Sequence, residues 1–304
     1  MQNNGQPSPT ALMAAAARAA HLLVDDGPPV FVDPLALTLL GQRADELLGY
    51  HRSYGAHPIL AGARTTAVAR GRYTEDLLAR LAEEGVDQYV ILGAGLDSFA
   101  YRSELAFRVD AYEVDLPATQ EWKRELLARA GIRVPSSTAF IPFDFEREPA
   151  QALTHHLVAA GFDLGRPALV SWLGVTMYLT PEAIGQTLDV VSGFAPGTEL
   201  VVEHLLPTGQ RDEAGQAYAE AVMAAAAGRG EPWRTFLSVE QMDALLREHR
   251  LDPVASVQQR EVMDPAGWER TDALRPFTLS VLTRANVPPR PGQLPAPPPC
   301  ARRR

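Results

Sequence analysis

The chain has 304 residues, of which 46% are hydrophobic and 21% are charged, a balance typical of a folded globular protein and not of a disordered one. Its 28 basic and 37 acidic residues give a formal net charge of −9, which argues against nucleic-acid binding, since that needs a basic surface. The one cysteine, Cys300, and the one lysine, Lys123, exclude a disulfide framework, a multi-cysteine zinc site and a phosphate loop ending in Gly-Lys-Ser/Thr.

The sequence shows no signal for export or membrane insertion. Residues 1–10 contain no basic group and no apolar run, so they do not form a signal peptide. No stretch reaches 18 consecutive apolar residues, the length that predicts a membrane-spanning helix. The sequence therefore predicts a cytoplasmic protein.

The two ends of the chain differ in composition from its middle. Residues 1–85 predict an N-terminal helical cap, because 9–24 are alanine-rich and amphipathic, 33–40 hold a short apolar run, and leucines recur at helical spacing over 64–84. Residues 286–304 hold seven of the 25 prolines and four arginines without an acid. Such a segment buries too little apolar surface to fold, so we predict a Pro-rich disordered tail.

Between cap and tail, residues 86–285 alternate short apolar runs with helical segments. This alternation predicts an α/β fold, with a Rossmann-like, doubly wound, mainly parallel seven-stranded sheet. A helical insert is expected at about 207–236. The seven strands are expected at 88–92, 109–115, 138–145, 168–174, 199–205, 254–260 and 276–284.

A glycine-containing loop follows the first predicted strand. Gly93 and Gly95 allow the backbone to turn sharply and to approach a ligand closely. Asp115, 20 residues after Gly95, ends the next strand, where a carboxylate can accept hydrogen bonds from ribose hydroxyls. Strand, loop and acid together predict a site for an adenosine-containing cofactor.

Two further residues of the loop distinguish between such cofactors. Ser98 stands where a dinucleotide site usually has a third glycine, and Asp97 precedes it. A carboxylate here would repel a pyrophosphate but suits a ligand with ammonium and sulfonium groups, which favours S-adenosyl-L-methionine over NAD. Asp97 could alternatively cap the following helix. A Tyr-x-x-x-Lys pair, as expected of some NAD-dependent oxidoreductases, is also absent.

Several motifs of the chain occur together in one known family. They are QYVILGAGLD at 88–97, AYR at 100–102, EVDLP at 113–117, Lys123, the segment 16–36 and WLGVTMYLTP at 172–181. With these motifs the sequence resembles the bacterial relatives of leucine carboxyl methyltransferases, which are class I S-adenosylmethionine-dependent O-methyltransferases. The resemblance covers roughly residues 10–285.

The resemblance implies cofactor-binding roles for six residues. Arg70 would hold the cofactor carboxylate, since a guanidinium can donate two parallel hydrogen bonds to it. The others are Gly93 and Gly95 under the methionine part, Asp115 at the ribose, Asp144 at the adenine amine and Phe145 beside the adenine.

Two positions depart from the family pattern. Many relatives have a glutamate five residues before the tyrosine of the fourth-strand motif, and here that position is Leu173. Many also have Thr-Arg where this chain has Ser98 and Phe99. We therefore expect any contact of that glutamate with the cofactor to be absent or to come from another residue.

Candidates for the acceptor side follow the later strands. Tyr178 and His204 are expected at the carboxyl ends of strands, where open α/β sheets bind ligands. Either could act as a base for a phenol or alcohol, or could simply be a packing residue, whereas a carboxylate acceptor needs no base. Trp233 of the insert is a further candidate for the pocket wall. No metal site is predicted, and His155 and His156 are interpreted as surface residues, since they have no further ligand at metal spacing.

The sequence thus predicts a methyltransferase that uses S-adenosyl-L-methionine to methylate a carboxyl or hydroxyl oxygen of a small-molecule, polyketide-like acceptor. An NAD-dependent oxidoreductase and a non-catalytic cofactor-binding protein of the same fold are the alternatives. No nucleic-acid or membrane partner is expected, and no particular oligomeric state is predicted.

Overall fold

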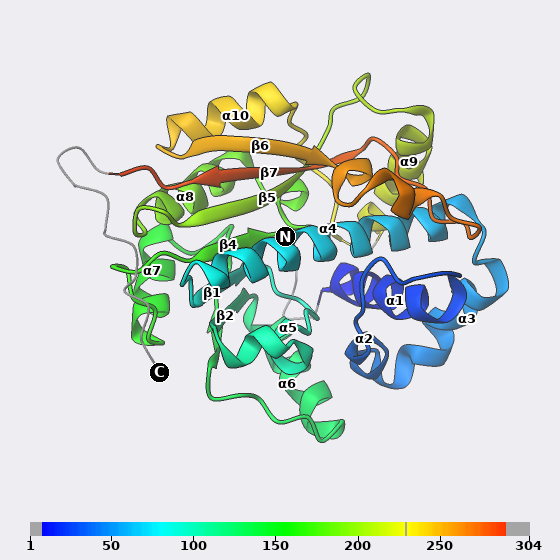
Figure 1. Cartoon of the computed structure of the whole chain (residues 1–304), viewed down its shortest axis with the longest axis horizontal. Helices are drawn as coiled ribbons and strands as arrows, with labels where there is room; N and C mark the ends of the chain where they lie inside the picture. The colour runs from blue at the N-terminus through cyan, green and yellow to red at the C-terminus, as the bar shows by residue number, and fades with distance from the viewer. Residues whose placement is uncertain (1–7, 229, 290–304) are drawn as a thin grey trace.

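A seven-stranded β-sheet forms the centre of the molecule (Figure 1). The computed structural model describes residues 8–228 and 230–289. The strands are β1 Gln88–Leu92, β2 Asp110–Asp115, β3 Thr138–Pro142, β4 Leu169–Trp172, β5 Glu199–Leu205, β6 Asp252–Gln258 and β7 Ser280–Asn286. Their spatial order is β3-β2-β1-β4-β5-β7-β6, and every neighbouring pair is parallel except the two that contain β7. The predicted mainly parallel sheet is confirmed.

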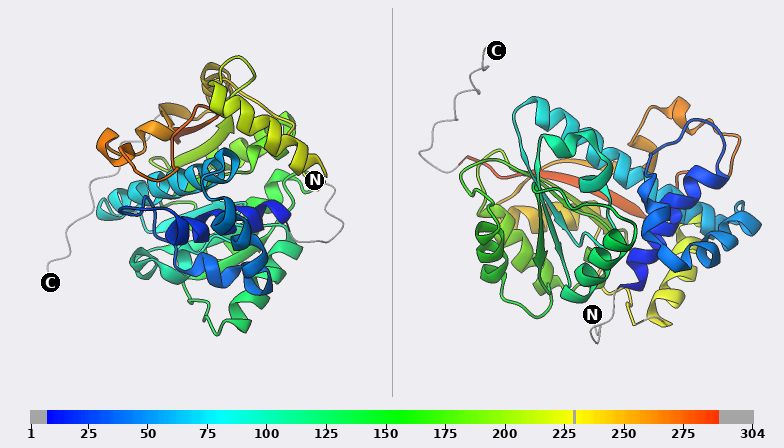
Figure 2. Two further views of the ribbon diagram at one scale, coloured as in Figure 1. Left: turned by 90° about the vertical axis from the view of Figure 1, so that its right-hand side faces the viewer. Right: turned by 90° about the horizontal axis from the view of Figure 1, so that it is seen from below.

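Helices cover both faces of this sheet, and Figure 2 shows α7 and α8, in green, along one side. Side chains of α7, α8 and α10 pack on one face, and those of α4 and α5 pack on the other. The helices are α1 Pro9–Val24, α2 Leu35–Leu39, α3 Ala44–Tyr54, α4 Pro58–Glu83, α5 Phe99–Arg102, α6 Pro117–Arg129, α7 Ala150–Ala159, α8 Pro181–Ser192, α9 Glu213–Gly228 and α10 Val239–Glu248. This is the doubly wound arrangement that the strand–helix alternation predicts.

The central strands are buried on both sides, which explains why they read as continuous apolar runs in the sequence. In β1, Val90 and Leu92 join the core beneath α7 and α8, whereas Tyr89 and Ile91 join the core beneath α4. Successive side chains of a strand point to opposite faces, so one five-residue run supplies both cores.

The N-terminal helices pack together beside the sheet. Pro9 occupies the first turn of α1, and the Ser8 side chain caps the helix by accepting a hydrogen bond from the Ala11 backbone at 3.3 Å. α1 contacts α2, α3 and α4, and α9 contacts α4. The predicted insert at 207–236 therefore contributes α9, which lies against the longest N-terminal helix. Among the described residues, no helix is both long and apolar enough to cross a bilayer.

Five strands differ in extent from the sequence prediction. β2 begins at Asp110, one residue later than predicted, and β4 spans Leu169–Trp172 rather than 168–174. β3 ends at Pro142, where proline has no N–H to continue the ladder, rather than at 145. β7 extends over 280–286 because it pairs residue by residue with the whole of β5, from Glu199 opposite Asn286 to Leu205 opposite Ser280. β6 follows β7 in register and so ends at Gln258, two residues before its predicted end. Of the predicted tail, β7 includes Asn286, and 290–304 lie outside the described residues.

Candidate functional site

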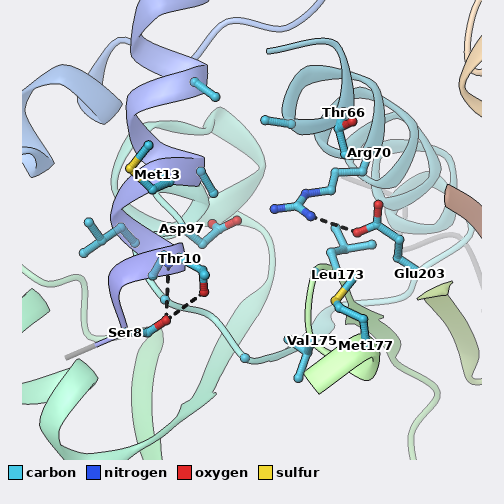
Figure 3. Close-up of a pocket in the computed structure, with 18 of the residues that line it drawn as sticks. Ser8, Thr10, Met13, Thr66, Arg70, Asp97, Leu173, Val175, Met177 and Glu203 are labelled. Atoms are coloured by element: carbon cyan, nitrogen blue, oxygen red, sulfur yellow. Dashed lines mark hydrogen bonds and ion pairs between the residues drawn. The ribbon is translucent and has the colours of Figure 1, made fainter. Parts of the chain in front are cut away.

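A cavity of about 430 Å³ opens at the carboxyl ends of β1, β4 and β5 (Figure 3). The order of the sheet reverses between β1 and β4, and ligands of open α/β folds bind at such a switch point. Helices α1, α4 and α9 supply the remaining walls. Figure 3 shows α1 and α4 facing each other, with Arg70 projecting from α4 into the space between them.

The glycine loop after β1 forms the floor of this cavity. Gly93 and Gly95 have φ angles of +72° and +49°, which residues other than glycine rarely adopt. A Cβ atom on Gly93 would lie 2.3 Å from Cγ2 of Val175, so the neighbouring loop leaves no room for one. Both glycines line the cavity, and their backbone is therefore exposed to a ligand.

The Asp115 carboxylate holds this loop in place. Its Oδ2 accepts a hydrogen bond from the Gly95 backbone at 2.6 Å, and its Oδ1 accepts one from the Leu116 backbone at 2.7 Å. Burial raises the pKa of Asp115 above its usual range, although both backbone donors oppose the rise. Each carboxylate oxygen has a second lone pair, so the group can still accept from hydroxyls of a ligand in the cavity.

The other predicted cofactor residues also line the cavity. Asp97 does so while its Oδ1 accepts from the backbone of Phe99, the first residue of α5, at 2.7 Å, although the N-cap position itself is Ser98. Asp144 follows β3, and its Oδ1 accepts from the Glu146 backbone at 3.0 Å. Phe145 is buried and packs edge-on against Phe143, with ring centroids 5.2 Å apart. The structure thus brings Arg70, Gly93, Gly95, Asp97, Asp115, Asp144 and Phe145 to one cavity.

Carboxylates outnumber cationic groups around this cavity. The lining includes three arginines, and all three are already paired: Arg18 with Asp33 at 2.7 Å, Arg70 with Glu203 at 2.8 Å, and Arg102 with Glu75. Within the described part of the chain, neither Asp97 nor Asp115 has an arginine or lysine partner in an ion pair. The cavity therefore favours a cationic ligand over a phosphate. Its acidic lining residues are Glu75, Asp97, Asp115, Asp144, Glu146 and Glu203.

The structure separates the two acceptor-side candidates. Tyr178 lies in a short 3₁₀ turn, Thr176–Tyr178, and lines the cavity together with Trp233. His204 is not among the cavity-lining residues: its Nδ1 lies 2.9 Å from the Leu237 carbonyl and its Nε2 lies 3.0 Å from the Thr283 hydroxyl. A carbonyl only accepts, so Nδ1 donates and Nε2 accepts, which occupies both ring nitrogens. His204 is therefore a buried structural residue with no access to an acceptor.

Two polar residues of the cavity lining, Glu203 and Ser8, were not predicted from the sequence. Glu203 is 1% exposed, lies two residues before the end of β5 and pairs with Arg70. The signal was present, because a carboxylate within the apolar run ELVVEHL is unusual for a strand buried on both faces. Ser8 was also missed: its hydroxyl donates to Glu231 at 2.9 Å and so ties the start of α1 to the loop after α9.

In 8–228 and 230–289, no three His, Cys, Asp or Glu side chains are grouped to hold a metal ion. His155 is exposed on α7, with its ring centroid 6.2 Å from that of His156.

The doubly wound fold and the acidic cavity above its glycine loop are typical of proteins that bind a nucleoside-containing cofactor. Comparisons with known proteins identify the family. The family model for leucine carboxyl methyltransferase matches residues 11–192. A Bacillus subtilis (strain 168) protein named "Putative S-adenosyl-L-methionine-dependent methyltransferase YktD" is 30% identical over 214 residues, which cover 70% of this chain and 69% of that protein. A Mycolicibacterium paratuberculosis protein with the same description is 34% identical over 212 residues, covering 67% and 68%.

Solved structures agree with these sequence comparisons at the level of the fold. A "putative methyltransferase" of Thermobifida fusca YX superposes with a TM-score of 0.59 at 20% identity, covering 94% of this chain and 97% of that one. A DUF574 family protein of Streptomyces avermitilis gives 0.58 at 18% identity, covering 90% and 97%. The chain belongs to the leucine carboxyl methyltransferase family. It is a methyltransferase whose cofactor is S-adenosyl-L-methionine, which decides against the oxidoreductase alternative.

Proposed function

We propose that the enzyme transfers the methyl group of S-adenosyl-L-methionine to a carboxyl or hydroxyl oxygen of a small, largely apolar acceptor, of which a polyketide-like metabolite is one kind. The observation that carries this proposal is the cavity, which combines an acidic floor with an apolar wall. Apolar side chains of the loop after β4, of α9 and of the segment before β7 form that wall, including Met177, Val222 and Leu279. This wall suits the apolar body of such an acceptor, whether a carboxyl or a hydroxyl oxygen is methylated.

The lining residues fit the cofactor part by part. Asp115 can accept from the ribose hydroxyls, and Asp144 can accept from the adenine amine, with Phe145 beside the ring. Gly93 and Gly95 line the cavity, so their backbone can meet the methionine part. The carboxylate of Asp97 adds negative charge near a cationic ligand. These assignments agree with the roles that the family resemblance implies.

Methyl transfer asks the protein mainly for alignment and for exclusion of water. The bound cofactor supplies an activated methyl group on a sulfonium, so a carboxylate acceptor needs no base. Burial raises the pKa of Tyr178, so its phenol stays protonated at neutral pH and can donate a hydrogen bond to an acceptor oxygen. We assign Tyr178 to positioning the acceptor and not to proton abstraction.

Three measurements on the full chain test this function. S-adenosylhomocysteine at 100 times its dissociation constant should stabilise the fold by about 2.7 kcal/mol, and NAD should not. Asp115→Ala should weaken binding in calorimetry, and it should also lower the unfolding midpoint, because the Gly95 and Leu116 N–H groups lose their acceptor. Release of S-adenosylhomocysteine should then accompany turnover of aromatic hydroxy or carboxylic acids from an acceptor panel. Stabilisation by NAD instead would refute the proposal, and binding without turnover of any acceptor would favour a non-catalytic protein.

A further inference from the structure

The Arg70–Glu203 pair places opposite charges side by side on the cavity wall, at the carboxyl end of the sheet. Arg70 Nη1 donates to Glu203 Oε2 at 2.8 Å, with side-chain exposures of 19% and 1%. Both residues line the cavity, Arg70 from α4 and Glu203 from β5 (Figure 3). Residues 133 positions apart in the sequence thus bring a guanidinium and a carboxylate into contact in the cavity wall.

The position of Glu203 in the sheet relates it to Leu173. β4 and β5 are parallel, and Trp172 is opposite Val202 in their register. The next residue of each strand is therefore Leu173 on one side and Glu203 on the other, and both face the cavity. Leu173 is where the family pattern has a glutamate, so this chain carries its carboxylate one strand further along the sheet.

The pair is only partly satisfied by the protein. Among the described residues, Glu203 uses one carboxylate oxygen in a side-chain hydrogen bond, and Arg70 uses one of its five N–H donors. Unused hydrogen-bonding groups at a buried charge cost free energy unless a ligand or water meets them. The free oxygen and the free guanidinium edge together present an acceptor beside a fork of donors.

We propose that Arg70 and Glu203 form a clamp for the zwitterionic end of the cofactor, with Glu203 accepting from its α-ammonium group and Arg70 donating to its α-carboxylate. This inference rests on the proposed cofactor site and adds a residue to it. Four alternating charges satisfy one another, whereas either ligand group alone would leave one protein charge unmatched. The clamp therefore makes the enzyme selective for ligands with an intact amino-acid end.

A two-by-two binding experiment tests the clamp. Calorimetry on the full-length protein compares S-adenosylhomocysteine with its analogue in which a hydroxyl replaces the α-amino group, for the wild type and for Glu203→Gln. A hydrogen bond between charged groups is worth about 1.5–3 kcal/mol, so we expect the wild type to prefer the amino ligand roughly 10- to 100-fold. Glu203→Gln should lose most of this preference, because the amide keeps the contact to Arg70 but has no charge.

The control is Glu199→Gln, at the other end of β5, where Glu199 pairs with Arg284 at 3.2 Å. This variant should keep the wild-type preference. An equal preference in the wild type and Glu203→Gln would overturn the clamp, and so would a wild type that binds both ligands alike, a result that needs no variant to fold. Failure of the wild type to bind S-adenosylhomocysteine at all would instead refute the proposed function.

Discussion

Gly93 shows how a single residue allows two loops to pack closely at the cavity floor. Its φ of +72° and a hypothetical Cβ contact of 2.3 Å with Val175 are two separate obstacles to any side chain. Gly131, after α6, offers a matched control, since its φ is +68° but nothing lies within 4 Å of its Cβ position. The two glycines share the backbone requirement and differ only in crowding.

Alanine substitutions should separate these two effects. Gly131→Ala should destabilise the fold by about 1–2 kcal/mol, the cost of a left-handed non-glycine residue. Gly93→Ala should cost about 1–3 kcal/mol more than Gly131→Ala, as in an overpacked core. The double variant Gly93→Ala/Val175→Ala should recover part of that extra loss, because the smaller side chain removes the crowding. Urea unfolding of the three proteins measures both differences. Equal losses for the two glycines would show that the loop can move away from Val175.

Tyr178 distinguishes positioning from acid–base chemistry. If its hydroxyl only orients the acceptor, Tyr178→Phe should lower kcat/KM by about 2- to 10-fold, the worth of one neutral hydrogen bond. A general base would lose about 10²- to 10⁴-fold. The measurement is the rate of S-adenosylhomocysteine release with an accepted substrate. Affinity for S-adenosylhomocysteine serves as the control and should not change.

At the scale of elements, a buried ion pair joins α6 to β2. Lys123 Nζ lies 2.6 Å from Glu113 Oε2, and each side chain is 1% exposed. Lys123 also lies over the ring of Tyr101, 5.2 Å from its centroid. The only lysine of the chain therefore fixes a helix to the strand that ends in Asp115.

Removing one partner of this pair should be more harmful than removing both. Lys123→Met leaves an uncompensated buried carboxylate and should cost about 3–5 kcal/mol of unfolding free energy. In the double variant with Glu113→Leu the loss should be smaller, because no buried charge remains. Denaturant unfolding gives both values. A double variant less stable than Lys123→Met would contradict a dominant charge effect.

Local patterns were enough to predict most elements and part of the site. Apolar runs located all seven strands, and the loop at 93–97 located the cavity, because each signal lies within a few adjacent residues. The limits of β7 depend on pairing with β5, which lies far away in the sequence, and the limits of β6 depend on pairing with β7. Arg70 and Glu203 meet only through the fold, and so do Ser8 and Glu231. Contacts of this kind have no local signature: the run ELVVEHL marks Glu203 as unusual for a buried strand, but it does not show that Arg70 is its partner.

At the scale of the whole molecule, two buried histidines link stability to pH. Burial lowers the pKa of His204 to about 4, and burial together with Arg64 lowers that of His51 to about 4. His204 joins β5 to β7 through Thr283, and His51 of α3 lies 3.2 Å from Arg64 of α4. One histidine thus belongs to the sheet and the other to the N-terminal helices. Burial raises the pKa of Glu75 to about 7, so the contribution of Glu75 to stability changes with pH in the opposite direction to that of the histidines.

Because other groups also titrate, the histidine effect is best measured as a difference between variants. Below pH 6.5 the unfolded chain protonates His204, whereas the folded protein does so only near pH 4, so its contribution to stability falls as the pH drops through this window. In His204→Gln, the amide can still donate to Leu237 and accept from Thr283 but does not titrate. The stability advantage of the wild type over this variant should therefore shrink by roughly 3 kcal/mol between pH 7 and pH 4. Urea unfolding at several pH values measures this difference, and a constant difference would mean that the folded protein protonates His204 as readily as the unfolded chain.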